Sequence, residues 1–111
     1  MLFSIVVSAP PLPPTTPRLL DARAIPYFLW DLGWTVGEAH EILAGSDQGK
    51  KDELIVRLLR EANSRDVWLF LDWPLIEEAW PRVERRLGRA RPVWQMMLSR
   101  RRERREHAPA H

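Results

Sequence analysis

Apolar residues recur at helical spacing between residues 54 and 62, and this stripe constrains the fold more than any other feature of the sequence. Its members lie at positions i, i+1, i+4, i+5 and i+8: Leu54, Ile55, Leu58, Leu59 and Ala62. Such spacing is typical of an amphipathic helix that packs one face against a core. Ser46 or Asp47 can cap its N-terminus. We therefore predict a helix over residues 47–62.

A second helix is predicted directly before it, over residues 36–44. Thr35 and Glu38 have the spacing of a capping box, in which each side chain binds the other residue's backbone N–H. Gly45 is the expected left-handed residue at the C-terminal end. The connection to the next helix is therefore only a few residues long.

The following segment, residues 67–71, fits either a strand or a helix. We favour a helix because Ser64 is an available cap and the neighbouring segments are helical. Asp72 and Pro74 then indicate the start of another helix, since proline is favoured in a first turn. Pro81 should end or kink that helix.

A last helix is predicted to begin near Pro92, and its apolar pattern stops at Arg100. The predicted fold class is therefore all-α: a small bundle of four or five short helices with an extended proline-rich N-terminal segment. Five prolines within residues 10–17 favour extended backbone there. We divide the chain into a flexible lead-in over residues 1–24, a helical domain over 25–99 and a basic, partly disordered tail over 100–111.

The composition excludes several classes of protein. A chain of 111 residues fits one domain, and the absence of cysteine excludes disulfides, thiolate metal sites and a cysteine nucleophile. No stretch approaches the ~20 apolar residues of a membrane span, and the short apolar start is no signal peptide. We expect a cytoplasmic protein.

Charge is divided unevenly along the chain. Residues 1–81 hold seven Lys and Arg against twelve Asp and Glu, a balance of −5, and residues 82–111 hold ten Arg against three Glu, a balance of +7. A basic end on an acidic body suggests an acidic partner, although a solvated helix end or contact with another copy would also explain it. The candidate residues for nucleic-acid or acidic-partner contact are Arg100, Arg101, Arg102, Arg104 and Arg105.

Residues with catalytic potential do not form a recognisable constellation. His40 is the only histidine in the predicted folded body, and we expect it at the surface. The string from Gly45 to Lys51 resembles a phosphate loop, but its glycine spacing is one residue short and a helix precedes it. We predict no enzyme, no metal site and no cofactor.

An aromatic cluster, residues 27–34, has two interpretations. It holds four aromatic residues in eight positions, and it either closes over the helices as a lid or forms a recognition surface. Tryptophans at residues 68, 73, 80 and 94 have the spacing of core positions, which favours packing over stacking on nucleic-acid bases. The candidate partner-binding residues are Tyr27, Trp30, Asp31, Trp34, Glu38 and Glu41.

Two strings, PYFLWD at residues 26–31 and DVWxFL at residues 66–71, carry a resemblance that covers about residues 25–98. The chain resembles a group of short helical bacterial proteins of unassigned function, often encoded beside a nucleotidyltransferase-type toxin of the abortive-infection class. The resemblance implies a small antitoxin-like partner protein. The proline-rich lead-in and the Arg-rich tail depart from the group.

Three functional hypotheses follow. The first is a protein–protein interaction module. The resemblance implies that it is the antitoxin-like partner of a nucleotidyltransferase toxin and acts by covering a basic nucleotide-binding cleft. The second is a nucleic-acid-binding protein that acts through the Arg-rich tail without sequence preference. The third is a structural module whose aromatic residues are all internal. The sequence leaves the oligomeric state open.

Overall fold

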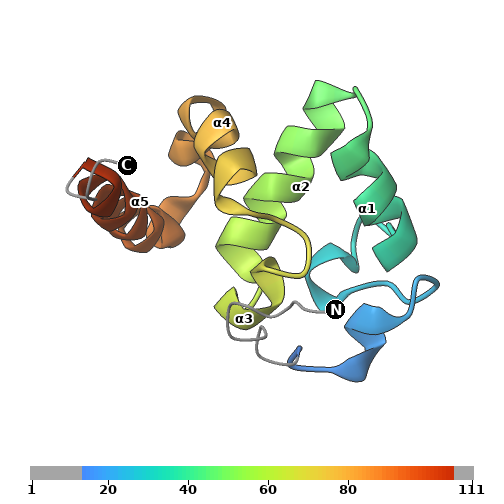
Figure 1. Ribbon diagram of the computed structural model, residues 1–111. Coiled ribbons are helices and arrows are strands. Elements are labelled where there is room, and N and C mark those ends of the chain that lie inside the picture. Colours follow the sequence, from blue (N-terminus) through green and yellow to red (C-terminus); the bar gives the residue numbers. More distant parts are fainter. Residues whose placement is uncertain (1–13, 107–111) are drawn as a thin grey trace, which may run out of the picture.

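The computed structural model describes residues 14–106, and within this range the chain is helical, as predicted (Figure 1). Its α-helices are α1 (Val36–Ala44), α2 (Gln48–Glu61), α3 (Ser64–Val67), α4 (Trp73–Val83) and α5 (Arg91–Glu106). Short 3-10 turns join or precede them: η1 (Pro17–Leu20), η2 (Tyr27–Leu29), η3 (Glu84–Arg86) and η4 (Gly88–Ala90). The prediction of an all-α fold is confirmed.

Helix α2 forms the centre of the fold. It lies between α1 and α4, and it also contacts η2, α3 and η4 (Figure 1). Four of its five predicted core residues are buried, and Ala62 is partly buried just beyond the helix end. Val56, which lies outside the predicted stripe, is buried as well. It is covered because α2 has neighbours on more than one side, whereas the stripe predicts only one buried face.

The N-terminal caps of α1, α2 and α4 are formed by side chains at the starts that the sequence indicates. The Thr35 backbone N–H donates to Glu38 at 2.9 Å, and the Glu38 N–H donates to the Thr35 hydroxyl at 3.1 Å, which completes the capping box of α1. Asp47 caps α2 and Asp72 caps α4. The prediction for Gly45 is wrong, because this residue has extended backbone with a φ of −87° and a ψ of −169°.

The prediction of a helix over residues 67–71 is wrong beyond its first residue. Asn63, not Ser64, caps α3, and this helix ends at Val67. Residues 68–70 form turns in which Phe70 and Leu71 both donate backbone hydrogen bonds to the Val67 carbonyl. The turns reverse the chain so that Asp72 can adopt the extended conformation of a cap for α4.

Pro81 neither ends nor confines α4, which continues to Val83 before it tightens into η3. A proline removes one backbone donor from the preceding turn of a helix. Pro81 is exposed, so water can replace the missing donor at little cost. The prediction that Pro81 ends the helix is therefore wrong, while the alternative of a kink at Pro81 stays a prediction.

Residues 14–24 are the described part of the predicted flexible lead-in. They pack onto the helices. Leu19 is buried in η1. The carbonyls of Ala24 and Ala22 accept hydrogen bonds of 2.8 and 2.9 Å from the N–H groups of Val36 and Gly37. These N–H groups lie in the first turn of α1, where helices lack internal partners. A Cβ on Gly37 would lie 3.1 Å from the Ala22 oxygen, so a larger residue here would need the Ala22 backbone to move slightly away.

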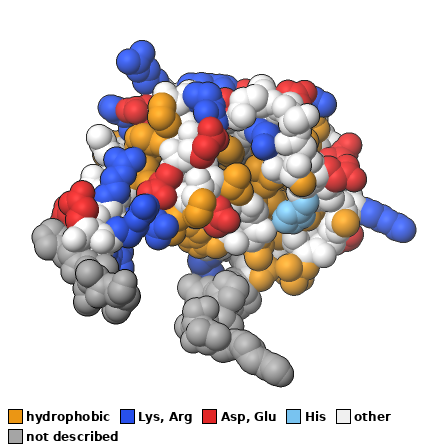
Figure 2. Space-filling view, turned by 45° about the horizontal axis from the view of Figure 1, so that its top comes forward, with side chains coloured by type: hydrophobic (Ala, Val, Ile, Leu, Met, Phe, Trp, Pro, Cys, Tyr) orange, Lys and Arg blue, Asp and Glu red, His pale blue; other side chains and the backbone are white. Residues whose placement is uncertain are grey.

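Helix α5 lies beside α4 at the edge of the fold (Figure 1). Trp94 and Leu98 are its buried residues, and the indole N–H of Trp94 donates to the Leu59 carbonyl at 2.8 Å. The predicted boundary at residue 99 falls inside α5, which continues through the basic segment to Glu106. The rest of the predicted tail, residues 107–111, lies outside the described residues. Lys and Arg side chains gather over this end of the fold, with Asp and Glu among them (Figure 2).

None of the helices in the described range is long and apolar enough to cross a membrane.

Candidate partner-binding site

The aromatic cluster is built on η2 and the residue after it, where two buried side chains lie between two exposed ones. Phe28 and Leu29 are 1% and 0% exposed, whereas Tyr27 is 42% and Trp30 is 75% exposed. Successive residues of a 3-10 turn point about 120° apart, so one turn can place neighbouring side chains on opposite sides. The two buried residues anchor the turn in the core. The cluster therefore closes over the core through Phe28 and Leu29 and presents the Trp30 indole to solvent, while its role as a recognition surface stays a prediction.

The chain after Trp30 is held in a tight turn. The N–H groups of Leu32 and Gly33 both donate to the Leu29 carbonyl, at 3.0 and 2.9 Å. Gly33 has a φ of +70°, a conformation that residues with a side chain rarely adopt. The position of Trp30 is therefore set by backbone hydrogen bonds on its C-terminal side and by the buried pair on its N-terminal side.

Asp31 is engaged within the protein. Both of its carboxylate oxygens accept hydrogen bonds from the Arg57 guanidinium, at 2.6 and 2.9 Å. The hydrogen bonds from Arg57 lower the pKa of Asp31. Arg57 also lies 3.5 Å from Glu53 on its own helix. Asp31 therefore connects the aromatic turn to α2, and its carboxylate is already in an ion pair with Arg57 of the same chain.

Tyr27 is engaged as well, although it is partly exposed. Its hydroxyl accepts a hydrogen bond from the Asn63 backbone N–H and donates one to Asp66, each 2.7 Å long. Its ring meets Phe28 edge-on, with centroids 5.1 Å apart. Asp66 is fully buried and also accepts hydrogen bonds from the backbone N–H and the hydroxyl of Thr15. Tyr27 therefore has a structural role that the sequence did not indicate.

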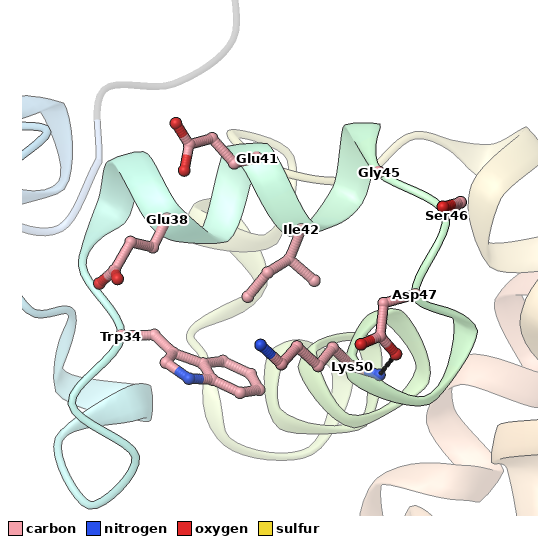
Figure 3. A pocket seen from close by; sticks show the side chains of 8 residues that line it. All are labelled: Trp34, Glu38, Glu41, Ile42, Gly45, Ser46, Asp47 and Lys50. Carbon is pink, nitrogen blue, oxygen red and sulfur yellow. Dashed lines mark hydrogen bonds between the residues drawn. The ribbon is translucent and has the colours of Figure 1, made fainter.

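A hollow of about 360 Å³ lies between α1 and the start of α2 (Figure 3). Trp34 and Ile42 form an apolar wall, and the Lys50 side chain extends across the hollow toward the Trp34 indole. Glu38 and Asp47 also line the hollow, and their side chains take part in the N-terminal caps of α1 and α2. Glu41 projects away from Trp34 on the outer side of α1.

The six predicted partner-binding residues thus differ in their surroundings. Tyr27 and Asp31 have partners inside the protein, while Trp34, Glu38 and Glu41 line the hollow. Trp30 is 75% exposed. The residues that the sequence interpretation missed are Thr15, Arg57, Asn63 and Asp66, each of which contacts the cluster from a distant segment. Hydrophobic spacing carries no signal for such contacts.

The five arginines predicted to contact an acidic partner lie on three sides of α5. Arg101 and Arg105 face the body, where both lie near Glu77, at 3.7 and 3.1 Å. The Arg101 guanidinium also lies 5.7 Å from the centre of the Trp73 ring, over its face. Arg100, Arg102 and Arg104 are exposed, and none of them is in an ion pair with another residue of the described range.

The tryptophans expected in the core are buried to different degrees. Trp80 and Trp94 are buried, whereas Trp73 is partly buried and Trp68 is more exposed. Trp68, Trp73 and Trp94 pack together with ring centroids 5.2 to 6.2 Å apart. This cluster joins the turn after α3 to α4 and α5.

His40 is exposed, as expected, and its ring stacks on Phe70 with centroids 4.7 Å apart. Residues 14–106 contain no group of three or more histidine, aspartate or glutamate side chains placed to hold a metal ion. The string from Gly45 to Lys51 joins α1 to α2, and Asp47 occupies the helix N-terminus by accepting a hydrogen bond from the Lys50 N–H at 3.1 Å.

Comparison of the chain with protein-family models, curated proteins and solved structures gives no match.

Proposed function

We propose that this chain is a small cytoplasmic protein–protein interaction module, and not an enzyme, whose contact face is centred on Trp30. The observation that carries the proposal is the 75% exposure of this indole on a turn whose two preceding residues are buried. Tryptophan is highly buried on average, and it is enriched among the residues that dominate binding energy at interfaces. A side chain of this size on a fixed turn loses little conformational freedom when a partner covers it.

The acidic residues that follow Trp30 in the chain suit a partner with a basic surface. Glu38 and Glu41 are exposed on α1, and neither is in an ion pair with another described residue. The hollow beside Trp34 is large enough for one side chain of the partner. Complementary charge mainly raises the association rate and the specificity, while a buried aromatic anchor supplies affinity. The roles of Trp30 and of the two glutamates are therefore separable by experiment.

The resemblance described above supplies a partner class, a nucleotidyltransferase-type toxin. In that case the chain acts as an antitoxin-like protein, and its acidic aromatic face covers the basic cleft in which the toxin binds its nucleotide. Exposed carboxylates can compete with the phosphate groups of the nucleotide for the arginines and lysines of that cleft. This mechanism requires no catalytic group in the chain.

The test is binding of the purified full-length chain to a nucleotidyltransferase-type protein encoded beside it, measured by calorimetry and size-exclusion chromatography. We expect a stable complex at micromolar concentration, and the substitution Trp30→Ala to weaken it by about 30-fold or more, as for an interface hot spot. Val93→Ala is the matched control, since Val93 is an exposed apolar residue on α5. It should bind as the wild type does.

Two outcomes would overturn different parts of the proposal. Absence of a complex at tens of micromolar would exclude the toxin as the partner. A complex that Trp30→Ala and Val93→Ala weaken equally would show that the contact face is not centred on Trp30. Glu41→Gln should slow association, with the slowing most marked at low salt.

A further inference from the structure

The arginines of residues 82–106 differ in whether the protein itself neutralises them. Five of the ten form ion pairs with carboxylates of the described range: Arg82, Arg86, Arg91, Arg101 and Arg105. The other five form none within residues 14–106: Arg85, Arg89, Arg100, Arg102 and Arg104. The charge balance of the sequence cannot separate these two groups. The ion pairs do separate them, and they identify the arginines that are available to an external anion.

Helix geometry places two of the available arginines in one row. Residues four apart lie on the same side of an α-helix, with an axial separation of about 6 Å. Arg100 and Arg104 therefore form an outer row, and Arg101 and Arg105 form an inner row that faces Glu77. Arg102 lies on a third side, at a groove of about 570 Å³ that Glu77, Arg105 and Glu106 also line. The inner row pairs with Glu77 on α4, whereas the outer row has no carboxylate partner within residues 14–106.

From this arrangement we infer that the outer row, Arg100 and Arg104, binds the phosphate backbone of a nucleic acid without reading its sequence. Arginine pairs strongly with phosphate, and sequence-independent binding needs only such contacts. A protein partner would instead need an apolar core in its interface, and residues 99–106 of α5 contain no apolar side chain. Lipid is less well matched, because Val93 and Met96 are the only exposed large apolar residues on this helix.

The contact surface lies on α5, and Trp30 lies on the turn after η2, so this activity does not depend on the proposed partner-binding face. The two are tested separately. Trp30→Ala should bind nucleic acid as the wild type does, and loss of nucleic-acid binding should leave the protein complex intact.

The experiment measures the anisotropy of a fluorescently labelled 20-nucleotide single strand, and of the matching duplex, across a salt series with the full-length chain. The variant Arg100→Gln with Arg104→Gln removes two charges and keeps good helix-forming residues. We expect the slope of log affinity against log salt to become shallower by about 1.4 for the single strand and about 1.8 for the duplex. The control, Arg85→Gln with Arg89→Gln, loses the same charge away from α5 and should keep the wild-type slope.

Three results would overturn the inference. The first is no binding at micromolar protein in about 50 mM salt, where sequence-independent contacts are strong. The second is an equal change of slope in both double variants, which would show a general effect of net charge. The third is binding to vesicles of phosphatidylcholine and phosphatidylserine without binding to either oligonucleotide, which would assign the outer row to a lipid surface.

Discussion

The hydroxyl of Tyr27 donates a 2.7 Å hydrogen bond to the buried carboxylate of Asp66, 39 residues further along the chain. The same carboxylate accepts both hydrogen bonds from Thr15, and the same hydroxyl accepts the N–H of Asn63. Two side chains thus join the N-terminal segment, the aromatic turn and the end of α2. We refer to Thr15, Tyr27, Asn63 and Asp66 as the clasp.

The clasp should contribute measurably to stability. Tyr27→Phe keeps the ring and removes the hydroxyl, so Asp66 loses a donor and the Asn63 N–H loses its acceptor. We expect the free energy of unfolding to fall by about 1–3 kcal/mol, measured by urea denaturation. A double-mutant cycle with Asp66→Asn measures the coupling between the two residues. A coupling energy near zero would show that the hydrogen bond contributes nothing.

The clasp should also make stability depend on pH in both directions. Burial alone would raise the pKa of Asp66, but the hydrogen bonds from Thr15 and Tyr27 outweigh it and lower the pKa below its ordinary value of 3.8. The contribution of the carboxylate is therefore present above about pH 4 and disappears as the pH falls through the lowered pKa. The difference in unfolding free energy between wild type and Asp66→Asn should stay constant near neutrality and shrink in acid. A difference that grows below pH 4 would contradict this.

At the alkaline end, burial raises the pKa of Tyr27 above 10.0. Its neutral hydroxyl contributes stability that is fully present below pH 10 and is lost as the pH rises through the raised pKa. The wild type should lose stability in this range relative to Tyr27→Phe, which cannot ionise. Absorbance of the tyrosinate ion near 295 nm follows the titration directly, because Tyr27 is the only tyrosine of the chain.

Trp94 should stabilise the C-terminal end of α2. The Asn63 N–H, four residues after Leu59, donates to Tyr27, and the Leu59 carbonyl instead accepts the indole N–H of Trp94. Trp94→Phe leaves this carbonyl without its tertiary donor and also reduces packing. We expect a loss of about 2 kcal/mol or more in urea denaturation. The matched control is Trp68→Phe, at the exposed side of the same cluster. An equal loss in both variants would show that only ring volume matters.

The capping box of α1 should contribute about 1 kcal/mol. Thr35→Ala removes the acceptor for the Glu38 N–H, whereas Thr35→Ser retains a hydroxyl at the same place. Thermal unfolding followed by circular dichroism should show a lower midpoint for the alanine variant and a small change for serine. Equal midpoints would indicate that backbone contacts from residues 22–24 alone secure the helix start.

The helix positions were predictable because their signals are local. Thr35, Asp47 and Asp72 cap helices through their own neighbours, and the stripe from Leu54 to Ala62 follows from helical period alone. The failures arose where distant contacts decide the outcome. The segment after Val67 leaves the helix, because residues 68–70 form turns before the extended cap residue Asp72. Apolar spacing left open whether the basic end of α5 is helical, and it is helical, with Glu77 on the neighbouring helix pairing with its inner row.

The candidate site divides in the same way. The sequence by itself determined that residues 27–34 concentrate aromatic side chains before a capped helix, and that the C-terminal end is basic. Only the tertiary structure decided that Trp30 faces solvent while Tyr27 and Asp31 bind within the protein. It also decided that Arg100 and Arg104 are unpaired within residues 14–106 while Arg101 and Arg105 are not. The physical reason is that helix caps and periodicity depend on residues a few positions apart, whereas exposure and charge pairing depend on segments that meet only when the chain folds.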